Sequence, residues 1–349
     1  MGEKIVVNTV SQLTSGTRAA GRQHHLFGIV AALLVGLAIA WPVHAQDKSK
    51  GKRVAMLQTL ATHPYVATTT NSFKARAERY GMEVTVFTAI FDAALQAQQM
   101  DDAIARKFDL IAVMAAHESA VVPAMARAKA AGIPVIMVNN TPKAGAEEFY
   151  VTFVGQDQVA MGRVTGESVL RALKASGRDG GRVALITGAL QQGLGPHRVA
   201  GFREAMKANP KVQIVAVEDG KWQTALSEKI AGQLYARYAA SGGLDAVYGM
   251  ADNQAIAAIR AAEAAGISVG SKPKQLIVVG SNCLKEGIDA IKSEKLHSSV
   301  TQIPTDLGVK TADTVNDYFN GKKLPKQVLL PTELITKANV ARWAQKCSY

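Results

Sequence analysis

Val121-Val-Pro-Ala-Met-Ala-Arg-Ala-Lys-Ala-Ala-Gly-Ile-Pro-Val-Ile-Met-Val-Asn-Asn140 contains one complete helix–strand unit. The spacing of its apolar residues predicts a helix over 121–131, and Gly132 stands where the end of a helix needs a left-handed residue. Pro134 then precedes a short apolar, β-branched run that predicts a strand over 135–138. This strand ends at two amide side chains, Asn139 and Asn140.

The same unit recurs on both sides of this stretch. Strands are predicted at 53–57, 83–87, 110–114, 135–138, 150–154, 182–187, 212–217, 246–248 and 276–280. Helices are predicted at 66–80, 93–107, 121–131, 159–175, 198–208, 224–238 and 254–265. This alternation is typical of parallel sheets covered by helices. Because the cycle begins again after Gly155, we expect an α/β fold with two similar domains rather than one large sheet.

The first 45 residues predict a signal peptide. Arg18 and Arg22 precede an apolar run over 26–41, and Val43-His44-Ala45 forms a small-residue cleavage site. The run is shorter than the ~20 residues that a membrane-spanning helix needs, so we expect a periplasmic chain that is not embedded in the membrane. The cleavage site has no cysteine that could carry a lipid. An uncleaved N-terminal anchor is the alternative.

Composition narrows the class of protein. Hydrophobic residues are 48% and charged residues 19% of the chain, which is the balance of a globular protein. The net charge is +12, but lysine and arginine are scattered among acids, so we expect no nucleic-acid partner. Cys283 and Cys347 would lie in an oxidising compartment, where either a disulfide or two buried thiols is compatible with the sequence. Neither cysteine has histidines or carboxylates at ligand spacing, so no metal site is expected.

The loops that follow the predicted strands carry no catalytic pattern. They offer no nucleophile–base pair, no G-x-S-x-G motif and no paired carboxylates, so we do not expect an enzyme. The glycine-rich loop Gly188–Gly195 resembles a phosphate loop in position, but it lacks both the Gly-Lys-Ser/Thr ending and the G-x-G-x-x-G spacing. No cofactor is therefore expected.

Amides and aromatic rings stand at these strand ends instead. Asn and Gln present a donor and an acceptor from one rigid group, which suits hydroxyls, and aromatic rings suit the C–H faces of a sugar. The amides are Asn139, Asn140, Asn282 and Gln302, and the rings are Tyr65 and Trp222. A parallel sheet binds ligands beyond the carboxyl ends of its strands, so this set predicts a neutral, hydroxyl-rich ligand.

Seven short motifs carry a resemblance to a known family. They are Thr59–Tyr65, Ala130–Val135, Val154–Asp157, Arg198–Phe202, Ala251–Asn253, Val278–Gly280 and Gln302–Gly308. In this order they resemble the periplasmic sugar-binding proteins of ABC importers, of the ribose-binding type. The resemblance runs from about Lys52 to Ile335.

The resemblance implies two Rossmann-like lobes with parallel sheets, joined by a three-stranded hinge, with the ligand in the cleft between them. The crossovers are expected near 153–156, 301–304 and 327–331. One lobe would contain 52–154 plus 303–328, and the other 155–302 plus 329–349. The expected function is that of a monomer that closes on a sugar or polyol and delivers it to an inner-membrane ABC permease.

The resemblance also implies a set of ligand-binding residues. It comprises Gln58, His63, Tyr65, Asn139, Asn140, Arg198, Trp222, Asp252, Asn282 and Gln302. Tyr65 and Trp222 match stacking aromatics, Arg198 the cleft arginine, and Gln302 a hinge-side amide. Asn139-Asn140 and Asn282 stand where family members commonly have an Asp-Arg pair and an Asp. Because amides replace aspartates at both places, D-ribose itself is in doubt and only the polyhydroxylated class is predicted.

Two other classes use the same lobes. Sugar-operon repressors carry an N-terminal helix-turn-helix, whereas this chain has an export leader there. A protein that presents its ligand to a chemoreceptor or sensor kinase, including one for a furanosyl autoinducer, would use the same closed form. The sequence does not separate that role from import.

Overall fold

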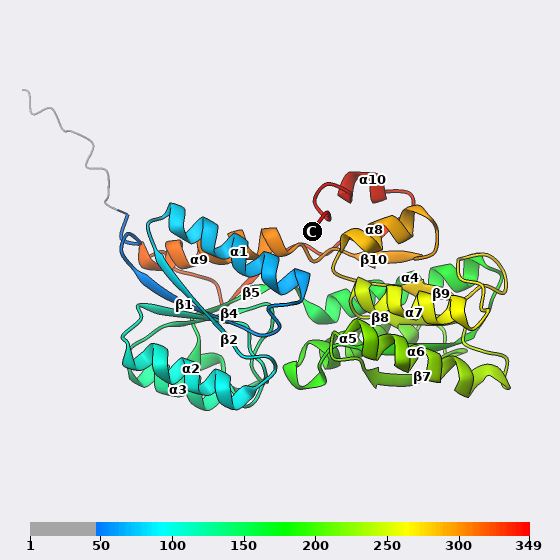
Figure 1. Cartoon of the computed structure of the whole chain (residues 1–349), viewed down its shortest axis with the longest axis horizontal. Coiled ribbons are helices and arrows are strands. Elements are labelled where there is room, and N and C mark those ends of the chain that lie inside the picture. Colours follow the sequence, from blue (N-terminus) through cyan, green and yellow to red (C-terminus); the bar gives the residue numbers. More distant parts are fainter. Residues whose placement is uncertain (1–46) are drawn as a thin grey trace, which may run out of the picture. The chain divides into compact units, whose positions relative to one another are not determined.

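Two sheets of six strands each organise residues 47–349, the part of the chain that the computed structural model describes (Figure 1). Residues 46–349 form one compact unit. The predicted signal peptide, 1–45, lies outside the described residues. Within the described residues, no helix is long and apolar enough to cross a membrane.

The first sheet is entirely parallel, in the order β11-β5-β4-β3-β1-β2. Its strands are β1 (Arg53–Gln58), β2 (Glu83–Thr88), β3 (Leu110–Val113), β4 (Val135–Val138), β5 (Thr152–Gly155) and β11 (Gln327–Leu329). Its helices are α1 (Pro64–Arg79), α2 (Ala93–Ala105), α3 (Val122–Ala130) and α9 (Pro304–Phe319), with a 3-10 turn η1 (Glu147–Phe149). Successive residues of β1 face opposite cores, so α1 and α9 cover one face of the sheet and α2 and α3 the other (Figure 1).

The second sheet has the order β12-β10-β9-β8-β6-β7, and only β12 is antiparallel to its neighbour. Its strands are β6 (Gly181–Thr187), β7 (Val212–Asp219), β8 (Ala246–Gly249), β9 (Ile277–Val279), β10 (Ser298–Val300) and β12 (Leu334–Thr336). Its helices are α4 (Gln158–Ala175), α5 (Leu194–Met206), α6 (Thr224–Ala239), α7 (Asp252–Ala264), α8 (Lys285–Lys292) and α10 (Val340–Trp343), with a 3-10 turn η2 (Leu190–Gln192). The first sheet with its helices is called the first half of the molecule, and the second sheet with its helices the second half. The helices α4 and α5 pack on one face, and α6, α7 and α8 on the other.

The α/β fold with two mostly parallel sheets, as predicted, is confirmed. The sequence did not indicate β10, β11, β12 or the helices α8, α9 and α10. These three strands have three residues each, which is too short for a period of two to be recognised. The helix α5 begins at Leu194, four residues before the predicted start, because Gly193 already adopts a left-handed φ of +79°.

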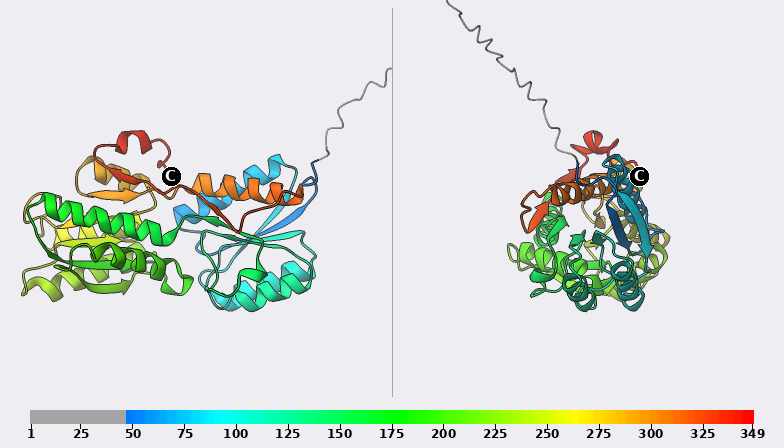
Figure 2. Two further views of the ribbon diagram at one scale, coloured as in Figure 1. Left: turned by 180° about the vertical axis from the view of Figure 1, so that it is seen from behind. Right: turned by 90° about the vertical axis from the view of Figure 1, so that its left-hand side faces the viewer.

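The chain passes between the sheets three times. It does so between β5 and α4, between β10 and α9, and between β11 and β12 (Figure 2). The Leu330 N–H donates to the Gly155 carbonyl at 2.8 Å, and the Thr301 N–H to the Glu333 carbonyl at 2.9 Å. Hydrogen bonds therefore join these passages to one another as well as to their sheets.

Candidate ligand-binding site

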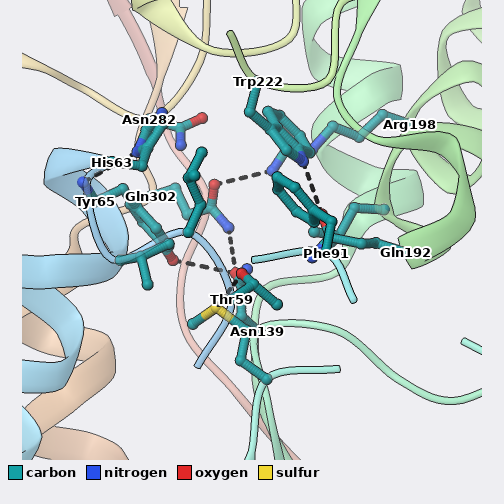
Figure 3. A pocket seen from close by; sticks show the side chains of 14 residues that line it. Thr59, His63, Tyr65, Phe91, Asn139, Gln192, Arg198, Trp222, Asn282 and Gln302 are labelled. Atoms are coloured by element: carbon teal, nitrogen blue, oxygen red, sulfur yellow. Dashed lines mark hydrogen bonds between the residues drawn. The ribbon is translucent and has the colours of Figure 1, made fainter. Parts of the chain in front are cut away.

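A cavity lies where the carboxyl ends of the two sheets' strands face each other (Figure 3). Its free space is about 390 Å³, part of which opens to solvent. The first half contributes Thr59, Leu60, His63, Tyr65, Val66, Phe91, Met114 and Asn139, and the remaining lining residues are Gln192, Leu194, Arg198, Trp222, Asn282 and Gln302. This is the edge at which open parallel sheets bind ligands.

His63 is the N-cap of the helix α1 and lines the cavity. Its Nδ1 accepts a hydrogen bond from the Tyr65 N–H at 3.2 Å, so the neutral ring carries its proton on Nε2. Burial lowers the pKa of His63, and the Asn253 side chain opposes that shift only in part, which keeps the ring neutral near pH 7. Nε2 is buried without a hydrogen-bond partner. His63 is thus a neutral donor whose Nε2–H makes no hydrogen bond within the fold.

Four side chains form a hydrogen-bonded chain across the cavity. The Tyr65 hydroxyl donates to Asn139 Oδ1 at 3.2 Å, and Gln302 Nε2 donates to the same oxygen at 2.9 Å. Arg198 Nη2 donates in turn to Gln302 Oε1 at 2.9 Å. Because Gln302 lies in the passage between β10 and α9, these bonds join the first half, the passage and the second half.

Arg198 is a buried cation held by neutral acceptors. Besides Gln302, it donates through Nε to Gln158 Oε1 at 2.7 Å and through Nη1 to the Met250 carbonyl at 2.6 Å. Burial lowers its pKa. The Trp222 ring centroid lies 5.6 Å from the guanidinium, within cation–π range. The site thus holds a positive charge that amides, a carbonyl and an aromatic face stabilise.

Trp222 depends on a glycine for its position. Its backbone is left-handed, with a φ of +60°. The indole packs so closely on Gly188 that a Cβ at that position would lie 1.8 Å from ring atoms Cε2 and Cζ2. Trp222 Nε1 donates to Gln192 Oε1 at 2.7 Å, and Asn253 Nδ2 donates to the Trp222 carbonyl at 3.1 Å. Both the ring and its backbone are therefore fixed from the second half.

The glycine-rich loop after β6 contacts the first half of the molecule. Gln192 Nε2 donates to the Ala115 carbonyl at 3.2 Å, and Asn140 Nδ2 donates to the Gln192 carbonyl at 3.2 Å. The Glu118 N–H also donates to the Gln191 carbonyl at 2.9 Å. The loop that resembles a phosphate loop in position thus bridges the two walls, and Gln192 couples this contact to Trp222.

Asn282 supplies an acceptor to the cavity. Its backbone is left-handed, with a φ of +90°, and its N–H donates to the Val300 carbonyl at 3.0 Å. Its side-chain Oδ1 is buried and has no hydrogen-bond partner. The next residue, Cys283, is joined to Cys347 by a disulfide, with a Cα–Cα distance of 5.2 Å.

Seven of the ten predicted ligand-binding residues line the cavity. They are His63, Tyr65, Asn139, Arg198, Trp222, Asn282 and Gln302. The other three, Gln58, Asn140 and Asp252, do not line it.

Each of these three side chains is used inside the fold. Gln58 bonds Thr70 and Thr88, at 2.6 and 3.0 Å. Asn140 bonds both backbone groups of Ala115, and it lines a neighbouring cavity. Asp252 is fully buried and accepts hydrogen bonds from Ser299 Oγ at 2.7 Å and the Leu284 N–H at 2.8 Å. Consecutive side chains at a strand end face different surroundings, and the sequence alone does not select between them.

Sequence reasoning missed seven lining residues. They are Thr59, Leu60, Val66, Phe91, Met114, Gln192 and Leu194. Phe91 follows β2 and Gln192 follows β6, so extending the strand-end rule to every polar or aromatic loop residue would have included both. Among residues 47–349, no group of three or more His, Cys, Asp and Glu side chains is arranged to hold a metal ion.

Comparison with known proteins places these features in context. A family model described as a periplasmic binding protein domain matches residues 54–323. The ribose import binding protein of Haemophilus influenzae is 24% identical over 315 residues, which cover 89% of this chain and 99% of the relative.

Solved structures share the fold. A galactofuranose binding protein aligns with a TM-score of 0.79 at 20% identity, covering 84% of this chain and 98% of the other. The fructose binding periplasmic domain of the hybrid two component system BT1754 aligns with a TM-score of 0.76 at 23% identity, covering 84% and 94%.

Proposed function

The chain belongs to the periplasmic binding protein family, and from this premise we propose that it captures a neutral sugar or polyol in the periplasm and delivers it to an inner-membrane ABC permease. The protein would act by binding alone, without a cofactor and without chemical change to the ligand. The relative named for ribose import supports this role, since nearly its whole length is matched.

The observation that carries the proposal is the chemistry of the cavity lining. Arg198 is the only charged side chain among the 14 lining residues, and neutral acceptors already hold it. Among these lining residues, the buried side-chain atoms without hydrogen-bond partners are one donor, His63 Nε2, and one acceptor, Asn282 Oδ1. A hydroxyl can satisfy both, because it donates and accepts. Trp222 and Phe91 add flat apolar surface of the kind that packs on C–H groups.

The names of the relatives support a small ligand. These relatives are named for ribose, galactofuranose and fructose, which are single-ring sugars. The cavity that would hold such a ring has a free space of about 390 Å³, part of which opens to solvent. We therefore infer a pentose, a hexose or a cyclic polyol, without choosing among them.

Closure would follow from ligand contacts on both walls. His63 and Asn139 belong to the first half, and Trp222 and Asn282 to the second, so one ring between them is held by both. A ligand shifts the equilibrium only by binding the closed form better than the open form. The bonds of Gln192 and Asn140 across the cavity support such a closed form.

Presentation of the ligand to a membrane sensor is the second candidate. The structural neighbour from a two component system favours it, because that domain has the same fold in a sensing protein. Loss of sugar uptake in a deletion strain, restored by the wild-type gene, would favour import. Normal uptake combined with lost sugar-induced gene expression would favour sensing.

A thermal-shift screen tests the proposed ligand class. The mature chain, residues 46–349, would be heated with pentoses, hexoses, linear polyols and inositols, each with and without Trp222→Ala. A ligand at 100 times its Kd adds about 2.7 kcal/mol to the free energy of unfolding. We expect one sugar or polyol to raise Tm in the wild type and much less in the variant.

Ligand that copurifies would mask the shift. Mass spectrometry of the denatured protein detects such a ligand, so the screen is repeated after unfolding and refolding. If no neutral sugar or polyol raises Tm in the refolded protein and none copurifies, the proposed function is wrong.

A further inference from the structure

The segment that follows α10, 344–349, reaches back to the wall of the cavity. In Figure 1 the chain leaves α10 and ends between the two halves. Cys347 in this segment is bonded to Cys283, which directly follows Asn282. The Tyr349 hydroxyl donates to the Asn282 carbonyl, and the Gln302 carbonyl lies 3.4 Å from the same hydroxyl. Asn282 and Gln302 both line the cavity, so the segment contacts the backbone of two lining residues although Tyr349 itself does not line the cavity.

Asn282 needs such support because of its backbone. Asn282 and Cys283 have φ values of +90° and +62°, a region that is uncommon for residues other than glycine; asparagine adopts it more readily than most, but two successive residues there need contacts that fix them. In this conformation Asn282 lines the cavity, and its Oδ1 is buried without a hydrogen-bond partner. A loop that relaxed to ordinary φ values would move this acceptor away.

Contacts on successive residues hold the loop. The Asn282 N–H donates to Val300, the Cys283 sulfur is bonded to Cys347, and the Leu284 N–H donates to Asp252 Oδ2 at 2.8 Å. The Asn282 carbonyl accepts a hydrogen bond from the Tyr349 hydroxyl. The phenol is buried, which raises its pKa, so it keeps the proton that it donates.

The geometry points to Tyr349 as a positioning residue for ligand binding, with the disulfide Cys283–Cys347 as the tether that delivers it. Tyr349 does not line the cavity. It acts through Asn282, whose side chain lines the cavity, and through Gln302, whose amide extends the hydrogen-bonded chain to Asn139. This inference rests on the proposed function for its effect on affinity, but its structural part does not.

The variant Tyr349→Phe removes the hydroxyl and keeps the ring. The matched control is Tyr238→Phe, because the Tyr238 hydroxyl also donates to a backbone carbonyl, that of Val215 at 2.8 Å, and neither residue belongs to the cavity lining. Both variants lose one bond of the same kind, so a general loss of stability affects them equally.

Two readouts separate positioning from stability. Hydrogen exchange with mass spectrometry follows the amides of 281–284 without any ligand, and calorimetry gives the Kd for L-arabinose and for myo-inositol. We expect faster exchange at 281–284 in Tyr349→Phe only. We also expect its Kd for whichever probe binds the wild type to rise about threefold to tenfold, the effect of one net hydrogen bond, with Tyr238→Phe unchanged.

Three results would decide the matter. Unchanged exchange at 281–284 in Tyr349→Phe overturns the inference. Faster exchange with a Kd equal to that of the wild type also overturns it, because the hydroxyl then holds the loop without serving binding. If neither probe binds the wild type, the calorimetry is repeated with the sugar or polyol that gives the largest thermal shift, and the exchange data still decide whether Tyr349 holds the loop.

Discussion

The substitution Gly188→Ala tests how closely the site is fitted around Trp222. The added Cβ would lie 1.8 Å from Cε2 and Cζ2 and 2.3 Å from Cδ2 of the indole. Carbon atoms in contact are separated by about 3.5 Å, so the indole must move by roughly 1.7 Å. Gly188 does not adopt a positive φ, so alanine suits its backbone and the effect comes from the ring alone.

Displacement of the indole removes one contribution to affinity and one to stability. The bond between Trp222 Nε1 and Gln192 Oε1 lies within the protein, so its loss lowers the free energy of unfolding by about 0.5–1.5 kcal/mol. The stacked aromatic face contributes about 0.5–1.5 kcal/mol to ligand binding beyond its buried area. The loss of this face predicts that Kd for the sugar with the largest thermal shift rises about twofold to tenfold or more. Trp222→Ala, which removes the ring entirely, is expected to weaken binding by more than about tenfold.

Isothermal titration measures both variants beside a glycine control. Gly232→Ala is suited to this, because a Cβ at Gly232 meets no atom within 4 Å, and we expect its Kd to equal that of the wild type. If folded Gly188→Ala binds the sugar within twofold of the wild type, the Trp222 indole does not contribute to binding from its observed position, and its assignment to the binding site is wrong.

Three further predictions concern buried polar groups and the disulfide. Arg198→Met leaves the acceptors on Gln158, Met250 and Gln302 unpaired and is expected to lower the free energy of unfolding by about 3 kcal/mol. Arg203 is exposed on the same helix, so Arg203→Met should change this free energy little. Urea denaturation measures both variants, and equal midpoints would contradict the prediction. Replacing both Cys283 and Cys347 by alanine opens a loop between residues 64 positions apart in the sequence. The unfolded chain gains conformational entropy, so the free energy of unfolding is expected to fall by about 4 kcal/mol, measured by the same urea denaturation. A loss below about 1 kcal/mol would refute this estimate. Burial raises the pKa of Asp252 from 3.8 to about 8, so between these pH values the folded chain holds a proton that the unfolded chain releases. The free energy of unfolding should therefore fall as pH rises from about 4 to about 8, and Asp252→Asn should flatten this fall. Parallel pH profiles for the wild type and the variant would show that Asp252 is not the source of the fall.

The sequence was sufficient for the architecture because most strands are short, buried apolar runs that are separated by clear helix ends. Gly132 and Pro134 mark the end of α3 and the start of β4, and the predicted bounds of β4 match those in the structure. The rule that ligands bind beyond strand ends then located the lining residues Asn139, Trp222 and Asn282 without knowledge of the tertiary structure.

The details of the site depend on contacts that no local pattern records. Asn139 and Asn140 are adjacent and chemically identical, but only Asn139 lines the main cavity, because the Asn140 side chain pairs with the backbone of Ala115. Gln192 lines the cavity because its loop crosses to the opposite wall. Tyr349 lies at the site only through a disulfide that joins residues far apart in the sequence.

A calorimetric titration at low and high ionic strength tests most directly whether this cavity binds a neutral polyhydroxylated ligand. The mature chain would be titrated with the sugar from the thermal screen in about 20 mM and about 500 mM salt, where the screening length differs severalfold. We predict one ligand per chain and the same Kd at both salt concentrations, because the lining offers amides, a neutral imidazole and aromatic faces. A Kd that rises steeply with salt, or binding only by anionic sugars, would show that Arg198 selects a charged ligand and would contradict the proposed function.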